Sequence, residues 1–108
     1  MSEEINFSNF NITIVGLGLI GGSLAKAVRK NMDFNNLWAI DVDRNVLKMA
    51  EDEGIIDEGY LSPEIPLPAS DVTIFCTYPK ATAEIIRNNV NNFKPDSIVT
   101  DASGIKNN

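Results

Sequence analysis

Histidine is absent from this sequence of 108 residues, and cysteine occurs once. Because imidazole is the side chain best suited to proton transfer near neutral pH, acid or base chemistry here must use another group. The single cysteine, Cys76, excludes an internal disulfide and is typical of a protein that works in a reducing cytoplasm. We interpret Cys76 as a small core residue, because no base lies near it in the sequence.

Basic residues and long apolar runs are also scarce. Nine Lys and Arg residues stand against fifteen Asp and Glu residues, and the resulting net charge of -6, without a basic cluster, argues against a nucleic-acid partner. No apolar run approaches the ~20 residues of a membrane helix, and the first ten residues, MSEEINFSNF, lack the features of a secretion signal. We therefore expect a soluble, cytoplasmic protein with no membrane partner and no metal site.

The order of the apolar segments predicts one α/β domain over residues 1–108. Strands are expected at 11–15, 37–40, near Tyr60, 72–76 and 97–100. Helices are expected from the glycine-rich segment to near Lys30, from Asp43 to Glu53, and over 79–90. This alternation predicts a Rossmann-type, doubly wound parallel sheet with strand order 3-2-1-4-5 and a three-layer α/β/α arrangement.

Local signals support these boundaries. Asp43 can cap the second helix, and Gly54 is placed to end it in the left-handed conformation. Pro79 suits the first position of the third helix. The segment LSPEIPLPAS, residues 61–70, holds three prolines, so we expect a loop there with neither a helix nor a central strand.

The glycines of IVGLGLIGGSLAKA carry the first functional signal. Gly16, Gly18 and Gly21 form the pattern G-x-G-x-x-G between a predicted strand and a predicted helix. Close packing alone could explain such a pattern, but Asp41 follows twenty residues after Gly21 (41 minus 21) at the end of the next strand, as in dinucleotide-binding domains. In that interpretation Gly16 makes the tight turn, Gly18 lets the backbone approach a pyrophosphate, and Gly21 brings the helix against the strand.

The strand-end carboxylate favours NAD as the cofactor. Asp41 can accept hydrogen bonds from both ribose hydroxyls, whereas its charge would face the 2'-phosphate of NADP. Arg44 leaves NADP open, since a nearby base could pair with that phosphate or stack on adenine. Residues after the fourth strand lie at the same sheet edge, so the full set expected to bind the cofactor is Gly16, Gly18, Leu19, Ile20, Gly21, Asp41, Arg44, Thr77, Tyr78 and Pro79.

A polar segment, TDASGIK, follows the fifth predicted strand at residues 100–106. It reads either as a simple polar turn or as a wall of the nicotinamide or substrate site. Ser103 and Lys106 are the residues we expect to face a substrate.

Three segments together resemble the N-terminal domain of prephenate/arogenate dehydrogenases: ITIVGLGLIGGSLAKAVRK, GIIDEGY and TDASGIK. The similarity covers nearly all of residues 11–106, and its most specific part is the block from Gly16 to Leu24. The resemblance implies a cytoplasmic, NAD- or NADP-dependent oxidoreductase of tyrosine biosynthesis, which oxidatively decarboxylates prephenate or arogenate and whose full-length form is a homodimer.

The chain also departs from that family. The segment after the fifth strand usually reads Asp-x-Gly-Ser-x-Lys, whereas here Ser103 and Gly104 are exchanged. The resemblance further implies a catalytic histidine and a helical substrate and dimerisation domain, which these 108 residues do not contain. We therefore expect a truncated cofactor-binding domain without catalytic residues of its own. A β-hydroxyacid dehydrogenase-like domain and a nucleotide-sensing regulatory domain remain as alternatives.

Overall fold

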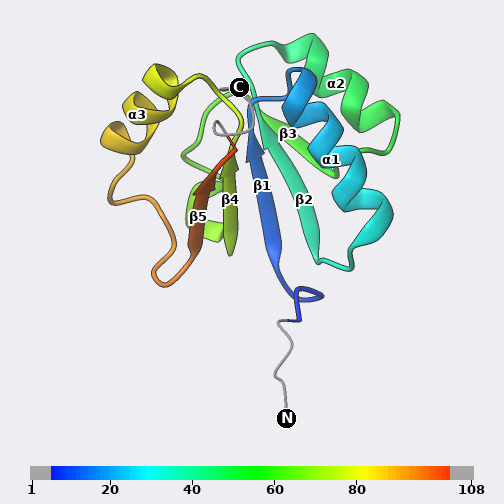
Figure 1. Cartoon of the computed structure of the whole chain (residues 1–108), viewed down its shortest axis with the longest axis horizontal. Coiled ribbons are helices and arrows are strands. Elements are labelled where there is room, and N and C mark those ends of the chain that lie inside the picture. The colour runs from blue at the N-terminus through cyan, green and yellow to red at the C-terminus, as the bar shows by residue number, and fades with distance from the viewer. Residues whose placement is uncertain (1–5, 103–108) are drawn as a thin grey trace.

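The computed structural model describes residues 6–102, which form a single parallel β-sheet flanked by helices (Figure 1). The strand order is β3-β2-β1-β4-β5, with β1 in the centre, and every pairing is parallel. The predicted Rossmann-type fold and strand order are confirmed. The strands are β1 (Asn11–Val15), β2 (Asn36–Ile40), β3 (Glu58–Tyr60), β4 (Val72–Phe75) and β5 (Ile98–Asp101).

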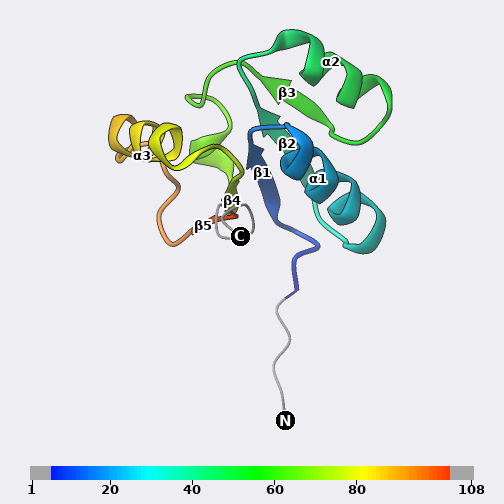
Figure 2. The ribbon, with the colours of Figure 1, turned by 45° about the horizontal axis from the view of Figure 1, so that its top comes forward.

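The helices lie on the two sides of this sheet, α1 and α2 on one side and α3 on the other (Figures 1 and 2). From β1 the chain first crosses to β2 and β3 on one side of the sheet, and later crosses to β4 and β5 on the other side. Because parallel crossovers are right-handed, these two directions put the helices on opposite faces of the sheet. The helices are α1 (Leu19–Asn31), α2 (Arg44–Asp52) and α3 (Pro79–Asn88), and a short 3-10 turn, η1 (Leu67–Ala69), precedes β4.

Alternate residues of the strands point to opposite faces of the sheet and pack into two separate hydrophobic clusters. Ile12 and Ile14 of β1 pack with Ala25 of α1 and Leu47 of α2. Val15, at the end of the same strand, joins a second cluster that includes Ile40, Leu67 and Phe75. Each fully buried aliphatic or aromatic side chain contributes roughly 1.5–3 kcal/mol of stability. A one-residue slip in strand register would move every side chain of the strand to the opposite face, so it would cost far more free energy than the loss of one contact.

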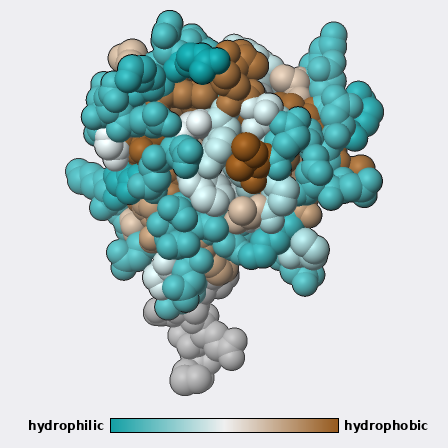
Figure 3. All heavy atoms as spheres, turned by 180° about the vertical axis from the view of Figure 1, so that it is seen from behind, coloured by the Kyte–Doolittle hydropathy of each residue, from teal (hydrophilic) through white to brown (hydrophobic). Residues whose placement is uncertain are grey.

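The surface seen from behind is mostly hydrophilic, with hydrophobic patches among the polar side chains (Figure 3). None of the described helices is long and apolar enough to cross a membrane. Likewise, residues 6–102 contain no group of three or more side chains that could hold a metal ion.

Two details of the predicted elements are wrong. The proline-rich loop contains the 3-10 turn η1, because Pro66 and Pro68 adopt compatible backbone angles while Leu67 is fully buried between them. The third helix ends at Asn88 rather than at Val90. Asn89 leaves the helical conformation and its side-chain Nδ2 donates to the carbonyl of Ile85 at 2.8 Å, an alternative to continuing the helix.

Two aspartates fix neighbouring strands at the amino-terminal edge of the sheet. Asp71, just before β4, accepts a hydrogen bond from the N–H of Asn11 at 2.8 Å and pairs with Lys94. Asp57, just before β3, accepts from the N–H of Leu37 at 2.8 Å and pairs with Arg29 at 3.2 Å. Each carboxylate therefore joins the start of one strand to the start of its neighbour and is balanced by a cation.

The hydrogen bond from Lys94, and then that from the Asn11 N–H, lower the pKa of Asp71 below its ordinary value. Because its pKa is lowered in the folded state, the Asp71 carboxylate stabilises the fold at pH values above its ordinary pKa. This stabilisation is lost as the pH falls through the folded-state pKa. We expect Asp71→Asn to reduce the free energy of unfolding at pH 7 by about 1–2 kcal/mol. The difference from the parent should close in urea titrations as the pH falls through the lowered pKa of Asp71, because the carboxyl group is then protonated in both the folded and the unfolded parent.

Asp52→Asn is the matched control, because Asp52 pairs with Lys48 on the exposed side of α2 at 3.5 Å. Exposed pairs of this kind contribute about 0.3–0.5 kcal/mol. A deficit in Asp71→Asn that stays constant down to pH 2 would contradict the assignment.

Candidate functional site

The turn between β1 and α1 is closed around Gly16. Its φ of +94° is unfavourable for any residue with a side chain. A Cβ at this position would also lie 3.0 Å from Cγ2 of Thr77 in the loop after β4. The N–H of Gly16 donates to the carbonyl of Ile40 at 2.7 Å, so the turn is held against both neighbouring strand ends.

Gly21 brings the first turn of α1 directly onto this turn. A Cβ built on Gly21 would lie 1.8 Å from the carbonyl oxygen of Gly16 and 3.3 Å from Cβ of Cys76. No side chain can be accommodated without moving backbone. The packing role predicted for the third glycine of the motif agrees with this close approach.

Gly18 differs from the other two glycines because it faces open space. Among the described residues, no atom lies within 4 Å of a Cβ built there. Gly18 is the N-cap of α1 and, as a glycine, provides no side chain to cap the first turn of the helix. The first turn contains no acidic residue. Its backbone N–H groups and the positive end of the helix dipole therefore suit an anion.

Asp41 is held against the glycine turn by its own carboxylate. Its Oδ2 accepts from the N–H of Leu17 at 2.8 Å, and its Oδ1 accepts from the N–H of Asp43 at 2.9 Å. Asp43 in turn caps α2 through the N–H groups of Asn45 and Val46, as the sequence predicted. The structure thus brings Asp41 together with the glycine motif.

The loop after β4 forms the other wall of this edge. Thr77 packs its methyl group toward Gly16, and its Oγ1 lies 2.6 Å from Oγ1 of Thr82 in α3. Tyr78 follows at the exposed start of α3, and Pro79 is the first residue of that helix. The expectation that this loop lies near the glycine motif is confirmed for Thr77.

Large apolar side chains are exposed at three points of this same edge: at the start of α1, after β2 and at the N-cap of α3. The exposed fraction is 89% for Leu19, 93% for Val42 and 76% for Tyr78. Side chains of this kind beside the first-turn N–H groups of a helix suit a ligand that combines charged groups with flat apolar rings. Sequence reasoning missed Val42, although an apolar residue directly after a strand-end acid is a signal that could have identified it.

Two other residues from the sequence analysis, Arg44 and Cys76, are described by the structure, and two more lie outside the described part of the chain. Arg44 lines a depression between α2 and β3, with Leu47, Lys48, Glu51, Gly59 and Leu61. Cys76 is buried, in agreement with its predicted core role. Ser103 and Lys106 lie outside residues 6–102.

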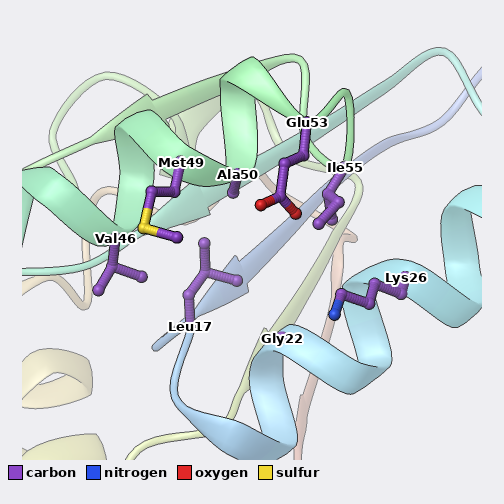
Figure 4. Close-up of a pocket in the computed structure, with 8 residues that line it drawn as sticks. All are labelled: Leu17, Gly22, Lys26, Val46, Met49, Ala50, Glu53 and Ile55. Carbon is purple, nitrogen blue, oxygen red and sulfur yellow. The ribbon is translucent and has the colours of Figure 1, made fainter.

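A cavity of about 270 Å³ lies between α1 and α2, behind the glycine turn (Figure 4). Its wall is mostly apolar, with Lys26 and Glu53 as the charged members. Leu17 connects this cavity to the site, since its side chain lines the cavity while its N–H binds Asp41. The lining residues are Leu17, Gly22, Lys26, Val46, Met49, Ala50, Glu53 and Ile55.

Gly21 and Gly22 provide a test of the packing at the motif. We expect Gly21→Ala to destabilise the protein by about 2–4 kcal/mol, because the new methyl group would overlap the Gly16 carbonyl. Gly22→Ala is the adjacent control, since a Cβ there would meet its nearest neighbour, the Leu17 carbonyl oxygen, at 3.7 Å. The control should gain about 0.5–1 kcal/mol of helix stability in urea unfolding. Equal effects of the two substitutions would refute the close approach.

Comparisons with known proteins agree with this geometry, although no family model matches the chain. A prephenate dehydrogenase from A. aeolicus, in complex with hydroxyphenyl propionate and NAD+, is 29% identical with a TM-score of 0.77. The match covers 94% of this chain and 34% of that one. A second prephenate dehydrogenase structure from Aquifex aeolicus is 31% identical with a TM-score of 0.74, over 83% of this chain and 33% of the other.

A more distant structure, a putative NADP oxidoreductase from Bacteroides fragilis, shares the fold at 17% identity and a TM-score of 0.73. That match covers 90% of this chain and 37% of the other. The present chain spans about a third of the length of the prephenate dehydrogenases it matches. The resemblance of this chain to the dinucleotide-binding domain of prephenate dehydrogenases is confirmed.

Proposed function

We propose that this chain, given its resemblance to the N-terminal domain of prephenate dehydrogenases, binds NAD and serves as the cofactor-binding domain of a prephenate or arogenate dehydrogenase. The observation that carries the proposal is the space left among residues 6–102 at Gly18, at the start of α1 and next to the turn that Asp41 binds. The whole protein would be a cytoplasmic enzyme of tyrosine biosynthesis that acts as a homodimer.

The residues present fit the pyrophosphate of a dinucleotide. A pyrophosphate would approach the backbone at Gly18, where a Cβ would meet no atom of residues 6–102 within 4 Å apart from its chain neighbours. The N–H groups of the first helical turn act on an anion at contact distance, whereas dispersed surface charge is screened beyond ~8 Å. The net charge of -6 is therefore compatible with binding this anionic ligand.

Asp41 would select the cofactor by its ribose. Its ionised carboxylate can accept hydrogen bonds from ribose hydroxyls, and it would repel a 2'-phosphate at the same position. Arg44, which follows Asp41 by three positions, lines the depression between α2 and β3 with Lys48 and Glu51. The preference for NAD over NADP therefore rests on the Asp41 carboxylate.

The bound nicotinamide would supply the hydride acceptor. The chain's own part is to hold that ring and exclude water, for which the exposed side chains of Leu19 and Tyr78 are suited. Oxidation of a hydroxyl group also releases a proton, and these 108 residues contain no histidine to accept it. We infer that this chain alone binds the cofactor but does not turn over a substrate.

Gly18→Val tests the proposed site. The side chain would point into open space, so the substitution should cost at most about 1 kcal/mol of stability through the poorer N-cap. It should nevertheless weaken NAD binding at least tenfold in calorimetric titrations, because the branched side chain fills the phosphate space. The parent should bind NAD more tightly than NADP.

Gly22→Ala is again the control and should bind NAD as the parent does. The proposed function fails if the parent binds neither dinucleotide at millimolar concentration. The proposed position fails if Gly18→Val binds NAD with unchanged affinity.

A further inference from the structure

We propose that Asp41 is also a positioning residue for the pyrophosphate-binding turn, so that ribose recognition and phosphate binding depend on one side chain. This inference rests on the proposed function. It is based on the hydrogen bonds of the carboxylate, which reaches across 24 positions of sequence to the backbone of Leu17.

The two carboxylate oxygens of Asp41 bind different backbone groups. Oδ2 accepts from Leu17, the central residue of the turn, and Oδ1 accepts from Asp43 at the start of α2. With both oxygens engaged, the side chain cannot rotate without losing one bond or the other. Asp41 is anchored as well through its own N–H, which donates to the carbonyl of Tyr60 at 3.1 Å.

The glycine turn needs such a contact because its own sequence provides little rigidity. Two of its three residues, Gly16 and Gly18, are glycines, which lose more conformational freedom on ordering than any other residue. Backbone bonds hold the two ends of the turn, from Gly16 to Ile40 and from Gly22 to Gly18. The middle of the turn is held by the hydrogen bond that the Leu17 N–H donates to the Asp41 carboxylate, and bonds to an ionised acceptor are of the strong class.

A ribose can be bound without releasing the turn. An ionised carboxylate has about four lone-pair positions, and the two backbone N–H groups use two of them. A 2'-phosphate, by contrast, would repel the carboxylate and displace it from Leu17. Discrimination against NADP would then include loosening of the turn that binds the pyrophosphate.

Inorganic pyrophosphate separates this role from simple ribose recognition, because it has no ribose. If Asp41 acted only through its charge and its ribose contacts, removing it would leave pyrophosphate binding unchanged or strengthen it, since a negative charge beside an anion site is lost. If Asp41 holds the turn, removing it must weaken pyrophosphate binding. The two accounts therefore predict different changes in pyrophosphate affinity when Asp41 is removed: no change or an increase in the first account, and a decrease in the second.

The experiment is an NMR titration with inorganic pyrophosphate on the parent, Asp41→Ala and Asp43→Ala, combined with amide hydrogen exchange. Asp43→Ala removes an equal charge from the same loop without touching the glycine turn. We expect Asp41→Ala to bind pyrophosphate several-fold more weakly than the parent, and Asp43→Ala to bind it at least as tightly. The Leu17 amide should exchange faster in Asp41→Ala alone.

Asp41→Asn keeps one acceptor oxygen and provides a second variant if Asp41→Ala does not fold. In either variant, faster exchange at Leu17 must accompany weaker pyrophosphate binding. Faster exchange with unchanged or tighter pyrophosphate binding would overturn the inference, as would a parent that binds NAD but not pyrophosphate. The proposed function would survive both results, and only a parent that binds neither NAD nor NADP would remove it.

Discussion

The contact between Gly21 and the carbonyl of Gly16 determines the geometry of the whole site. It allows the first turn of α1 to lie directly on the end of β1, with no side chain between them. The helix therefore begins at the carboxyl edge of the central strand, and the N–H groups of its first turn, which have no partner inside the helix, lie next to Gly18. Without this approach, the helix start would be separated from the strand end by at least one side chain.

The backbone N–H groups at the two edges of the sheet have different kinds of partner. At the amino-terminal edge, Asp57 and Asp71 accept hydrogen bonds from strand N–H groups, and each is balanced by a cation. At the carboxyl edge, Asp41 binds the middle of the glycine turn, but the N-cap of α1 is a glycine, which provides no side chain to cap the first turn. One edge is closed by the protein itself and stabilises the fold, whereas the other leaves donors for a ligand.

Much of the fold could be predicted because its signals are local. The spacing of Gly16, Gly18 and Gly21 and the capping residues Asp43 and Gly54 act within a few positions of the elements they define. The end of α3 could not be predicted from periodicity, since it depends on the side chain of Asn89 binding a carbonyl. The η1 turn was missed because burial of Leu67, a tertiary effect, outweighed the preference of prolines for a loop.

The grouping of Asp41 with the glycine motif was predictable from the sequence, but the hydrogen bonds that join them were not. Residue types and spacing indicate that Asp41 belongs with the glycine motif, yet they give no sign of a bond to Leu17, which exists only once two strands are paired. The exposure of Val42 likewise follows from the path of the chain after β2. Substrate-facing roles for Ser103 and Lys106 stay predictions.

A crystal structure of this chain with bound NAD tests the central claim most directly. The account predicts the pyrophosphate against the backbone N–H groups at Gly18 and the first turn of α1, with the adenosine ribose on Asp41 and the Asp41–Leu17 hydrogen bond intact. A dinucleotide bound elsewhere, such as the cavity between α1 and α2, would contradict the account. So would a glycine turn that stays empty at saturating NAD.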